Sequence, residues 1–568
     1  MPKIEVNQNA FFELAHQKYT VPELIDLLPV LKSEVDGAEG EVLKLEFNDT
    51  NRPDLWSTAG AARGLRVYYQ GWQPKYPFFS SPQKQQDDGG RKLVVDAGLK
   101  DIRPYCSAFA VNGKVDAAAL DDLIQTQEKL CHNFGRKRRT FAMGIFRRQL
   151  VKFPVHYRAA DPDATKFVPL GMTGTLSLRD IAKKHPKGVE YGYIAEAFPK
   201  FPLQQGDDGR ILSFPPVINS ADLGAVEVGD TELFIEITGT DMSAVTLAAS
   251  IVACDLADIG FEILPVTVEY PYDTPFGRQV TFPYAFQAPV KAELGYVNKL
   301  LGVNLVGEQV QAALKKTGVS GSYDNGVLTV TPPPYRNDFL HPVDIVEDVM
   351  IGHGLEQFEP VQPQDATIGR LTKEELFGRR VRDLMIGMGF QEMIYNYLGS
   401  KKDIIDKMAV DGSDVLQILN PMTENYEFVR NSVAPNLLET ESVSGHAAYP
   451  HHLFEVGKIV RLDAADNQGS VTRNSLGFLS AGPDENFNEI NARIASLFYY
   501  LDVEFTLKDS ADPRFIPGRA AEVLASGRTA GVFGEVHPQV LENWGAGVPA
   551  TLADLDLDTL LKVSGGKV

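Results

Sequence analysis

Hydrophobic and polar positions change their spacing several times along the chain, and each change marks a predicted element. Residues 42–47 (VLKLEF) alternate as a half-buried strand does, and the turn-forming NDTNRPD follows before a helix expected from Leu55. The polar, glycine-ended segment 80–90 (SSPQKQQDDGG) is typical of a linker. We therefore expect an N-terminal α+β module over residues 1–90.

The next part of the chain alternates helical and strand-like segments. Residues 117–135 (AAALDDLIQTQEKLCHNFG) are typical of a helix that ends at a glycine, and residues 232–238 (ELFIEIT) are typical of a strand. This alternation predicts a second α+β module over residues 91–265.

Residues 266–362 predict three helices and a hairpin. Helices are expected at 288–302 and 306–318, both ended by glycine, and a third begins near Pro342. Asn325-Gly326 between short apolar runs is a type I′ hairpin signal. Two helices, a hairpin wing and a third helix resemble a winged helix-turn-helix module.

The last part of the chain, residues 367–568, opens with an amphipathic helix. Thr372 and Glu375 form a TxxE capping box, and apolar residues recur at helical spacing up to about Gly389. Strand-like runs follow at MIYNYLG, HHLFEVGKIV, NSLGFLSAG, VEFTLK, TAGVFGEV and ATLADLDL. They predict one antiparallel sheet with helices packed on it, so the fold class is α+β and multidomain.

Composition and charge exclude several classes of protein and of binding site. The 568 residues carry 55 Lys and Arg against 75 Asp and Glu, a net charge of -20, which excludes a protein whose whole surface binds nucleic acid. Three separated cysteines build neither a disulfide framework nor a thiolate zinc site. The longest near-apolar stretch, residues 244–254, is too short to cross a bilayer, and the start lacks a signal peptide, so we expect a cytoplasmic protein with no membrane association.

An acidic constellation follows Arg336. In a helix that starts near Pro342, Asp344, Glu347 and Asp348 share one face, and Asp338 lies just upstream. Four crowded carboxylates repel one another, and Mg²⁺ would relieve them. The alternative is an N-cap with a solvated first turn, where acids are favoured by the helix dipole.

A basic and a polar constellation lie in the second module. Six cations lie within thirteen residues: Arg136, Lys137, Arg138, Arg139, Arg147 and Arg148. They predict a patch that attracts phosphate groups. The alternative is a solvated helix end with cations near its C-terminal dipole. Two strand ends could bring five polar side chains to one pocket mouth, where they would bind a polar substrate and orient a water. The alternative is that they are ordinary turn and cap residues. The five residues are Asn219, Ser220, Thr238, Thr240 and Asp241.

Four segments in this order resemble the beta-subunit family of phenylalanyl-tRNA synthetase: NDTNRPDLWSTAGAARGL, HPKGVEYGYI…LSFPPVIN, PPYRNDFLHPVDIVEDVMIGHG and GVFGEVHPQVLENWG…ATLADLDLDTL. The resemblance spans nearly the whole chain. Without an oligonucleotide-binding insertion near the start or a ferredoxin-like anticodon domain at the end, the chain is more similar to the archaeal and eukaryotic form than to the long bacterial one.

The resemblance implies a complex of two alpha and two beta subunits that attaches phenylalanine to its tRNA with ATP. It places aminoacylation on the alpha subunit and gives the beta chain an editing module that hydrolyses mischarged tyrosyl-tRNA. It identifies 91–265 as that module, 266–362 as a winged-helix-like module and 367–568 as a noncatalytic class II synthetase-like domain.

The family pattern also assigns residues. The D-x5-D-x2-E-[DE] magnesium pattern matches Asp338, Asp344, Glu347 and Asp348, and PPVIN matches an editing pocket with Asn219 and then Asp241 as catalytic candidates. Ser220, Thr238 and Thr240 would line that pocket, and the six cations would bind tRNA. Where the family often has a histidine-aspartate pair, this chain has Phe146 and Arg147.

The last domain lacks a complete set of class II ATP ligands. Active class II synthetases need two arginines that clamp the ATP phosphates. Arg430 could stand for the first, but Gly531 to His537 has no arginine at the second. We therefore expect this domain to bind a partner and not ATP.

Two other readings remain open. The chain could be a freestanding trans-editing aminoacyl-tRNA hydrolase that needs no partner, or a DNA-binding regulator that uses the winged helix. The helix pair balances Lys291, Lys299, Lys315 and Lys316 against nearby acids, which argues against strong DNA affinity.

Overall fold

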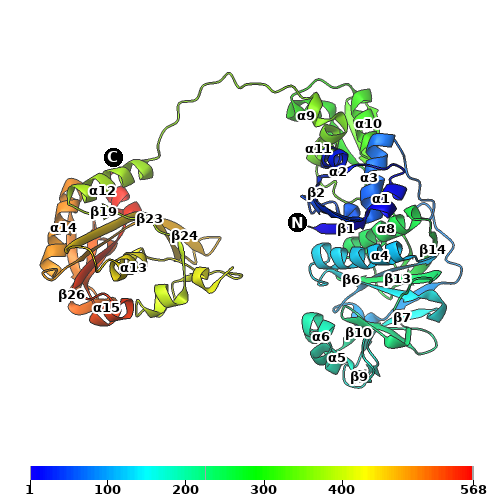
Figure 1. The fold of residues 1–568 in the computed structure, drawn as a ribbon, viewed down its shortest axis with the longest axis horizontal. Coiled ribbons are helices and arrows are strands. Elements are labelled where there is room, and N and C mark those ends of the chain that lie inside the picture. The colour runs from blue at the N-terminus through cyan, green and yellow to red at the C-terminus, as the bar shows by residue number, and fades with distance from the viewer. Residues whose placement is uncertain (1, 224, 566–568) are drawn as a thin grey trace. The chain divides into compact units, whose positions relative to one another are not determined.

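The computed structural model describes residues 2–223 and 225–565, and the chain divides into two compact units, residues 1–361 and 362–568 (Figure 1). Residues 359–371, which join them, form no helix or strand and are exposed. Helices and sheets occur together in both units, so the expected α+β multidomain class is confirmed. Among the described residues, no helix has both the length and the apolar character that crossing a membrane requires.

The first module of unit 1 packs three helices around a three-stranded sheet of order β1-β3-β2. Its elements are β1 (Lys3–Asn7), α1 (Gln8–Leu14), α2 (Val21–Leu27), β2 (Ser33–Glu39), β3 (Val42–Phe47) and α3 (Thr58–Gln70). The strand expected at 42–47 is thus confirmed. The helix expected from Leu55 begins at Thr58, because the Ser57 side chain accepts a hydrogen bond from the Gly60 N–H and caps it there.

The second module contains a ten-stranded sheet of order β12-β11-β10-β7-β4-β14-β5-β13-β6, with β15 on β14. Its strands are β4 (Lys92–Val95), β5 (Tyr105–Asn112), β6 (Phe141–Arg147), β7 (Val155–Ala160), β10 (Phe201–Gln205), β11 (Ile211–Phe214), β12 (Ile218–Asn219), β13 (Glu232–Gly239), β14 (Glu262–Glu269) and β15 (Gln279–Phe282). A two-stranded sheet joins β8 (Lys166–Phe167) to β9 (Leu176–Ser177). The helices are α4 (Ala117–Lys129), α5 (Leu178–Lys184), α6 (Pro186–Tyr191), α7 (Tyr193–Glu196) and α8 (Met242–Asp258).

A buried ionic network ties α3 to α8. The Arg63 guanidinium contacts Asp255 at 2.9 Å and Asp258 at 2.6 Å, and the Ser57 hydroxyl donates to Asp255 at 2.7 Å. Leu65 of α3 and Val252 of α8 belong to one hydrophobic cluster. The first two modules therefore share a core, which fixes one against the other.

The third module has three helices and a three-stranded sheet of order β16-β18-β17. Its elements are β16 (Val290–Glu293), α9 (Leu294–Leu301), α10 (Gly307–Lys316), β17 (Ser320–Asp324), β18 (Val327–Thr331) and α11 (Pro342–His353). Positive φ angles at Asn325 and Gly326 confirm the expected turn. The helix expected over 288–302 is wrong in its first part, because residues 290–293 pair with β18 and the helix spans only Leu294–Leu301.

Unit 2 is built on a seven-stranded sheet of order β19-β23-β24-β28-β27-β26-β25. Its strands are β19 (Gln391–Glu392), β23 (His451–Leu462), β24 (Ser470–Ala481), β25 (Phe505–Asp509), β26 (Phe515–Ala525), β27 (Arg528–Val536) and β28 (Ala550–Asp556). A small sheet holds β20 (Leu398–Gly399), β21 (Leu416–Gln417) and β22 (Phe428–Val429). The helices are α12 (Lys373–Gly387), α13 (Ala434–Val443), α14 (Phe487–Tyr500), α15 (Pro538–Trp544) and α16 (Leu557–Val563).

The expected antiparallel sheet is largely confirmed, with two differences. Of the run MIYNYLG, only Leu398 and Gly399 form a strand, and they belong to the small sheet. Strand β26 was missed, because Pro517 and Gly518 interrupt its alternation and a register shift separates Phe515 from Ala520. The only parallel pair in this sheet of the described structure is β19 with β23.

Candidate functional site

A cavity of about 170 Å³ lies between the two end strands of the ten-stranded sheet, β12 and β6. Its floor comes from β13 and β6, where Glu236 pairs with Gly144 and Thr238 with Ala142. Its wall comes from the turn after β11 and from β12, which contributes Asn219. We call it the sheet-edge cavity. It is lined by Gln127, Arg138, Ala142, Met143, Gly144, Leu170, Lys187, Ser213, Phe214, Pro215, Pro216, Val217, Ile218, Asn219, Glu236 and Thr238.

Glu236 is the most unusual group in the sheet-edge cavity. It is 2% exposed, and burial raises its pKa to about 8, although Arg103 partly offsets that rise. Its Oε2 and the Ser213 hydroxyl form no hydrogen bond of good geometry in the part of the chain that is described, although the Gln204 and Ser213 side chains lie close enough to lower the Glu236 pKa. Because buried polar atoms are nearly always paired, these two atoms indicate a place for a ligand that brings a hydrogen-bonding group.

The strand next to Glu236 leaves room for its side chain. A Cβ at Gly144 would lie 2.6 Å from Glu236 Oε1 and 2.8 Å from the Phe146 ring. On the same face, the Thr238 hydroxyl accepts a hydrogen bond from buried Arg103 at 3.1 Å, which fixes it in the cavity wall. Arg103 was not among the residues singled out in the sequence.

Only two of the five predicted pocket residues line the sheet-edge cavity, Asn219 and Thr238. The Asn219 side-chain amide donates to the Ile145 carbonyl at 3.4 Å. The other three lie outside the lining of this cavity and have structural contacts. Asp241 caps α8 by accepting from the Ala244 N–H at 2.8 Å, the Ser220 hydroxyl accepts from the Asp222 N–H, and the Thr240 hydroxyl donates to the Thr140 carbonyl.

The first half of the basic patch forms a strained turn at the cavity rim. Arg136, Lys137 and Arg138 have φ angles of 50°, 54° and 64°, a left-handed run that costs non-glycine residues about 1–2 kcal/mol each. Their N–H groups donate to the carbonyls of residues 133, 132 and 131. The turn points the Arg138 guanidinium at the Pro216 and Val217 carbonyls, at 3.0 and 3.1 Å, and over the Tyr191 ring.

The second half of the basic patch does not belong with the first. Arg147 contacts Glu227 and Asp230, both at 2.9 Å, and Arg148 contacts Glu232 at 2.8 Å. These carboxylates neutralise both arginines, and neither lines the sheet-edge cavity. Arg139 is exposed and donates to the Tyr193 hydroxyl at 3.1 Å.

The four acidic residues of the third module all have protein partners. Both oxygens of Asp338 and both of Asp348 accept hydrogen bonds from Arg336, at 2.6–3.0 Å. Glu347 contacts Lys32 at 2.7 Å, and Asp344 accepts from the Leu340 and His341 N–H groups. These carboxylates are therefore compensated by groups of the protein itself, and Mg²⁺ binding at them stays a prediction from the sequence.

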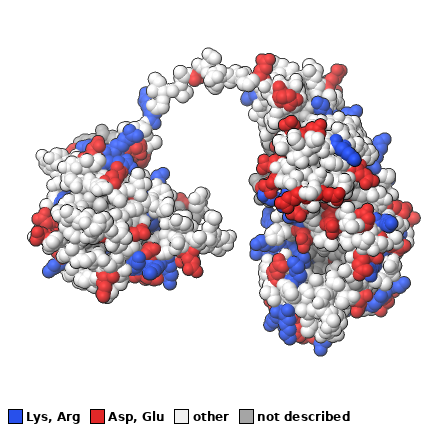
Figure 2. Space-filling view, viewed as in Figure 1, with Lys and Arg blue, Asp and Glu red and all other residues white. Residues whose placement is uncertain are grey.

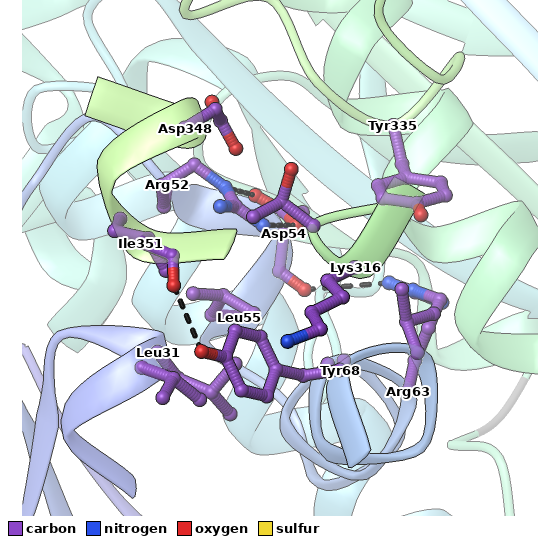
Figure 3. A pocket seen from close by; sticks show the side chains of 15 residues that line it. Leu31, Arg52, Asp54, Leu55, Arg63, Tyr68, Lys316, Tyr335, Asp348 and Ile351 are labelled. Carbon is purple, nitrogen blue, oxygen red and sulfur yellow. Dashed lines mark hydrogen bonds and ion pairs between the residues drawn. The ribbon is translucent and has the colours of Figure 1, made fainter. Parts of the chain in front are cut away.

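Asp348 also borders a small cavity between the first and third modules (Figure 3). The cavity measures about 30 Å³, the share of one water molecule in the liquid. Figure 3 shows Arg52 paired with Asp54, and the Tyr68 hydroxyl donating to the Ile351 carbonyl. Within the described ranges, no three His, Cys, Asp or Glu side chains converge as metal ligands. As placed, the acidic residues do not form a coordination cage.

In unit 2, the arginine that resembles an ATP ligand is occupied by protein groups. Arg430 is 1% exposed, and two of its nitrogens contact the Glu455 carboxylate at 2.8 Å. A third bond joins it to the Asn436 side chain, and its guanidinium lies over the Tyr397 ring. An arginine held in this way is not positioned to clamp a phosphate.

A set of large apolar side chains lies exposed around the small sheet of unit 2. Ile394, Leu419 and Met422 are 89%, 92% and 97% exposed, and Tyr397 and Tyr426 are about half exposed. We call these five residues the small-sheet patch. Clustered exposed apolar side chains are a common mark of a protein–protein interface.

Comparison with known proteins agrees with this arrangement. Residues 290–355 match the family described as "tRNA synthetase B5 domain", and residues 359–557 match "Phenylalanyl tRNA synthetase beta chain CLM domain". The phenylalanine–tRNA ligase beta subunits of Borrelia turicatae and Borreliella burgdorferi are 45% and 46% identical to this chain over 99% of its length and 100% of theirs. An N-terminal fragment of the phenylalanyl-tRNA synthetase beta subunit from Pyrococcus horikoshii is 34% identical, with a TM-score of 0.57 over 62% of this chain and all of the fragment.

The modules and their order therefore define a subunit of an aminoacyl-tRNA synthetase. More specifically, the chain belongs to the family of phenylalanine–tRNA ligase beta subunits.

Proposed function

We propose that the chain is the beta subunit of a phenylalanine–tRNA ligase that acts with an alpha subunit in a complex of two alpha and two beta chains. The alpha chain would carry the ATP-dependent attachment of phenylalanine to its tRNA. Support comes from family membership and from Arg430, which is bound by Glu455. The complex would work in the cytoplasm, where its tRNA is used.

We also propose that the sheet-edge cavity is an editing site for tyrosyl-tRNA. The observation that carries this proposal is the unpaired Glu236 Oε2 in a buried cavity. A phenolic hydroxyl entering the cavity would donate to it, whereas a phenylalanine side chain would leave it unpaired. Sites built to bond a hydroxyl reject the analogue that lacks it by large factors.

Hydrolysis would take place at the rim of the same cavity. Water adds to the ester carbonyl carbon, the bond to the ribose oxygen breaks, that oxygen takes a proton, and tyrosine leaves. Arg138 and Lys187 line the rim and would stabilise the negative charge that develops on the carbonyl oxygen. Asn219 would position the ester or the water.

The similarity to the Pyrococcus horikoshii fragment supports an archaeal-type arrangement of unit 1, although the curated relatives described above are from Borrelia and Borreliella.

We propose Mg²⁺ at the acidic residues from their sequence pattern alone. Arg336 occupies all four oxygens of Asp338 and Asp348, so an ion would have to displace it. The melting temperature with Mg²⁺ and with EDTA tests this. A response in wild type that is lost in Asp344→Asn/Glu347→Gln supports the ion, and equal melting contradicts it.

The functional proposal is tested by expression with an alpha chain. Phenylalanine charging should require both chains, and Asn219→Ala should let tyrosyl-tRNA accumulate while phenylalanine charging is unchanged. Asn337→Ala, an exposed change outside the cavity, is the control. Charging without the alpha chain would refute the subunit assignment. Tyrosine release by the isolated chain, unaffected by an alpha chain, would favour a freestanding hydrolase.

A further inference from the structure

Arg103 is a buried cation without a carboxylate partner, and it contacts the floor of the sheet-edge cavity. Figure 2 shows the usual place of Lys and Arg side chains, the surface, where water solvates the charge. Arg103 is instead 2% exposed. Three other arginines are as deeply buried, and each contacts a carboxylate at 2.6–2.9 Å: Arg63, Arg336 and Arg430. Arg103 forms no ion pair with any described residue. Because a buried cation without a counter-charge is costly, its charge calls for a role besides packing.

The hydrogen bonds of Arg103 join the floor of the cavity to its rim. Its Nε donates to the Thr238 hydroxyl at 3.1 Å, and its Nη2 donates to the Thr238 carbonyl at 2.6 Å. Its Nη1 donates to the carbonyl of Arg139, which follows the left-handed turn at 136–138, at 3.3 Å. The Tyr157 hydroxyl donates to the Arg103 carbonyl at 3.0 Å and anchors the residue to β7. One side chain therefore fixes a strand of the floor relative to the turn at the rim.

The charge of Arg103 also acts on Glu236. Glu236 and Thr238 are two residues apart on β13, so they lie on one face of the strand, and both line the cavity. Burial raises the pKa of Glu236, and the Arg103 charge is the largest influence that lowers it again. A nearby cation favours the carboxylate form of Glu236. That form accepts a stronger hydrogen bond from a hydroxyl than the protonated acid does.

The other ionisable groups near Glu236 keep their charge state around pH 8. Burial raises the pKa of three neighbouring groups, so they stay neutral in this range: Cys106, Cys131 and Tyr157. Gln204 and Ser213, which also face Glu236, do not ionise here. The rim adds the positive charges of Arg138 and Lys187. A change of the described site near pH 8 therefore reports on Glu236.

We propose that Arg103 is a positioning residue that makes editing selective for tyrosine. It holds the floor and the rim at the spacing at which a phenolic hydroxyl reaches Glu236 while the ester reaches Arg138, and its charge favours an acceptor opposite that hydroxyl. The proposal rests on the proposed editing function and deepens it. Arg103 is not one of the residues that line the described cavity, so it acts through Thr238, the turn and Glu236. A guanidinium suits this task because its donors are fixed in one plane and it stays charged when buried.

The first test compares Arg103→Gln and Arg103→Lys in the complex with an alpha subunit. Arg103→Gln should lower the ratio of tyrosyl-tRNA to phenylalanyl-tRNA deacylation rates at least ~10-fold. The loss should appear in kcat for tyrosyl-tRNA with KM unchanged, because the contacts to the RNA remain. Arg103→Lys keeps the charge but loses part of the planar fork, so its ratio should lie between those of wild type and Arg103→Gln.

A matched control and a check of folding accompany this test. Arg278→Gln is the same change at an exposed site beside β15, and it should leave the ratio unchanged. Melting temperature and phenylalanine charging show whether each variant folds and assembles. If Arg103→Gln does not fold, Arg103→Lys decides, because its ratio must still fall. An unchanged ratio in the folded variants overturns the proposal.

The second test is the pH profile of the same ratio, which a purely structural role would not move. Taking the ratio cancels the hydroxide-driven hydrolysis that both esters share. In wild type the ratio should rise as the pH passes about 8, where Glu236 ionises. In Arg103→Gln the rise should move to higher pH, because the cation that favours the carboxylate is gone, and in Arg103→Lys it should stay near the wild-type position. The same midpoint in wild type and Arg103→Gln overturns the proposal.

The outcomes separate this proposal from the editing proposal. If wild type releases tyrosine and phenylalanine at equal rates, editing fails and Arg103 has no selectivity to set, so both proposals are overturned. If wild type is selective and the Arg103 variants match Arg278→Gln in ratio and in midpoint, the editing proposal stands and only the role of Arg103 is overturned.

Discussion

At the scale of single residues, Glu236 carries most of the functional argument. Burial raises its pKa to about 8, so the folded state binds a proton that the unfolded state loses near pH 4.5. Stability should therefore fall as the pH rises from about 4.5 to about 8, and the penalty should stay constant above that range. Glu236→Gln should remove this pH dependence and raise the melting temperature at ~pH 8.5 more than at ~pH 5. Thermal unfolding at the two pH values measures the effect. Equal shifts in melting temperature at both pH values would show that folding does not raise the pKa of Glu236.

Arg336 is the second residue with a large expected effect. Arg336→Met removes the cation that is hydrogen-bonded to buried Asp338 and Asp348, and leaves Arg52 as the remaining cation near Asp338, so it should cost roughly 3–5 kcal/mol of unfolding free energy. Arg278→Met breaks an exposed pair with Asp273 and should leave the unfolding free energy almost unchanged, because water and salt screen the pair. Urea unfolding compares the two variants. A similar small effect for both would mean that the buried pairs are not the main support of α11.

At the scale of elements, the turn at 136–138 should respond to glycine in the opposite sense to a helix. Lys137→Gly removes a left-handed strain and should raise stability by up to about 1 kcal/mol. Lys183→Gly in α5 should instead lower it by about 1 kcal/mol, the usual cost of glycine in a helix. Unfolding free energies decide the point, and destabilisation by both changes would show that the turn is not strained.

Most elements followed from local pattern, and the exceptions have physical causes. The three helices and the turn of the third module depend on spacing and caps within a few residues, which the sequence displays. Strand β16 continues into α9 without a break, so only its pairing with β18 reveals it.

The candidate site could be predicted from the sequence less completely than the elements. Glu236 occupies an ordinary strand position, and its role depends on Gly144 opposite and on the burial that a ten-stranded sheet provides. Its one sequence signal is an acid in the middle of the apolar run ELFIEIT.

At the scale of the whole molecule, the small-sheet patch predicts a partner. The isolated chain should self-associate, and an alpha chain should convert it into a defined complex. Leu419→Asp/Met422→Asp should weaken that complex at least tenfold, a loss of about 1.4 kcal/mol or more. Val361→Asp, which is equally exposed in the connecting segment, should leave it unchanged. Light scattering with and without the alpha chain measures this. A stable monomer of 62.5 kDa whose mass does not change when the alpha chain is added would contradict the account.

The central claim is that the sheet-edge cavity selects tyrosine by its hydroxyl. The most direct measurement is the ratio of the deacylation rates of tyrosyl-tRNA and phenylalanyl-tRNA by the complex. The account predicts a ratio of at least ~10² in wild type, and a ratio near one in Glu236→Leu because tyrosine loses its bond while phenylalanine loses nothing. Equal rates for the two substrates in wild type, or an unchanged ratio in Glu236→Leu, would contradict it.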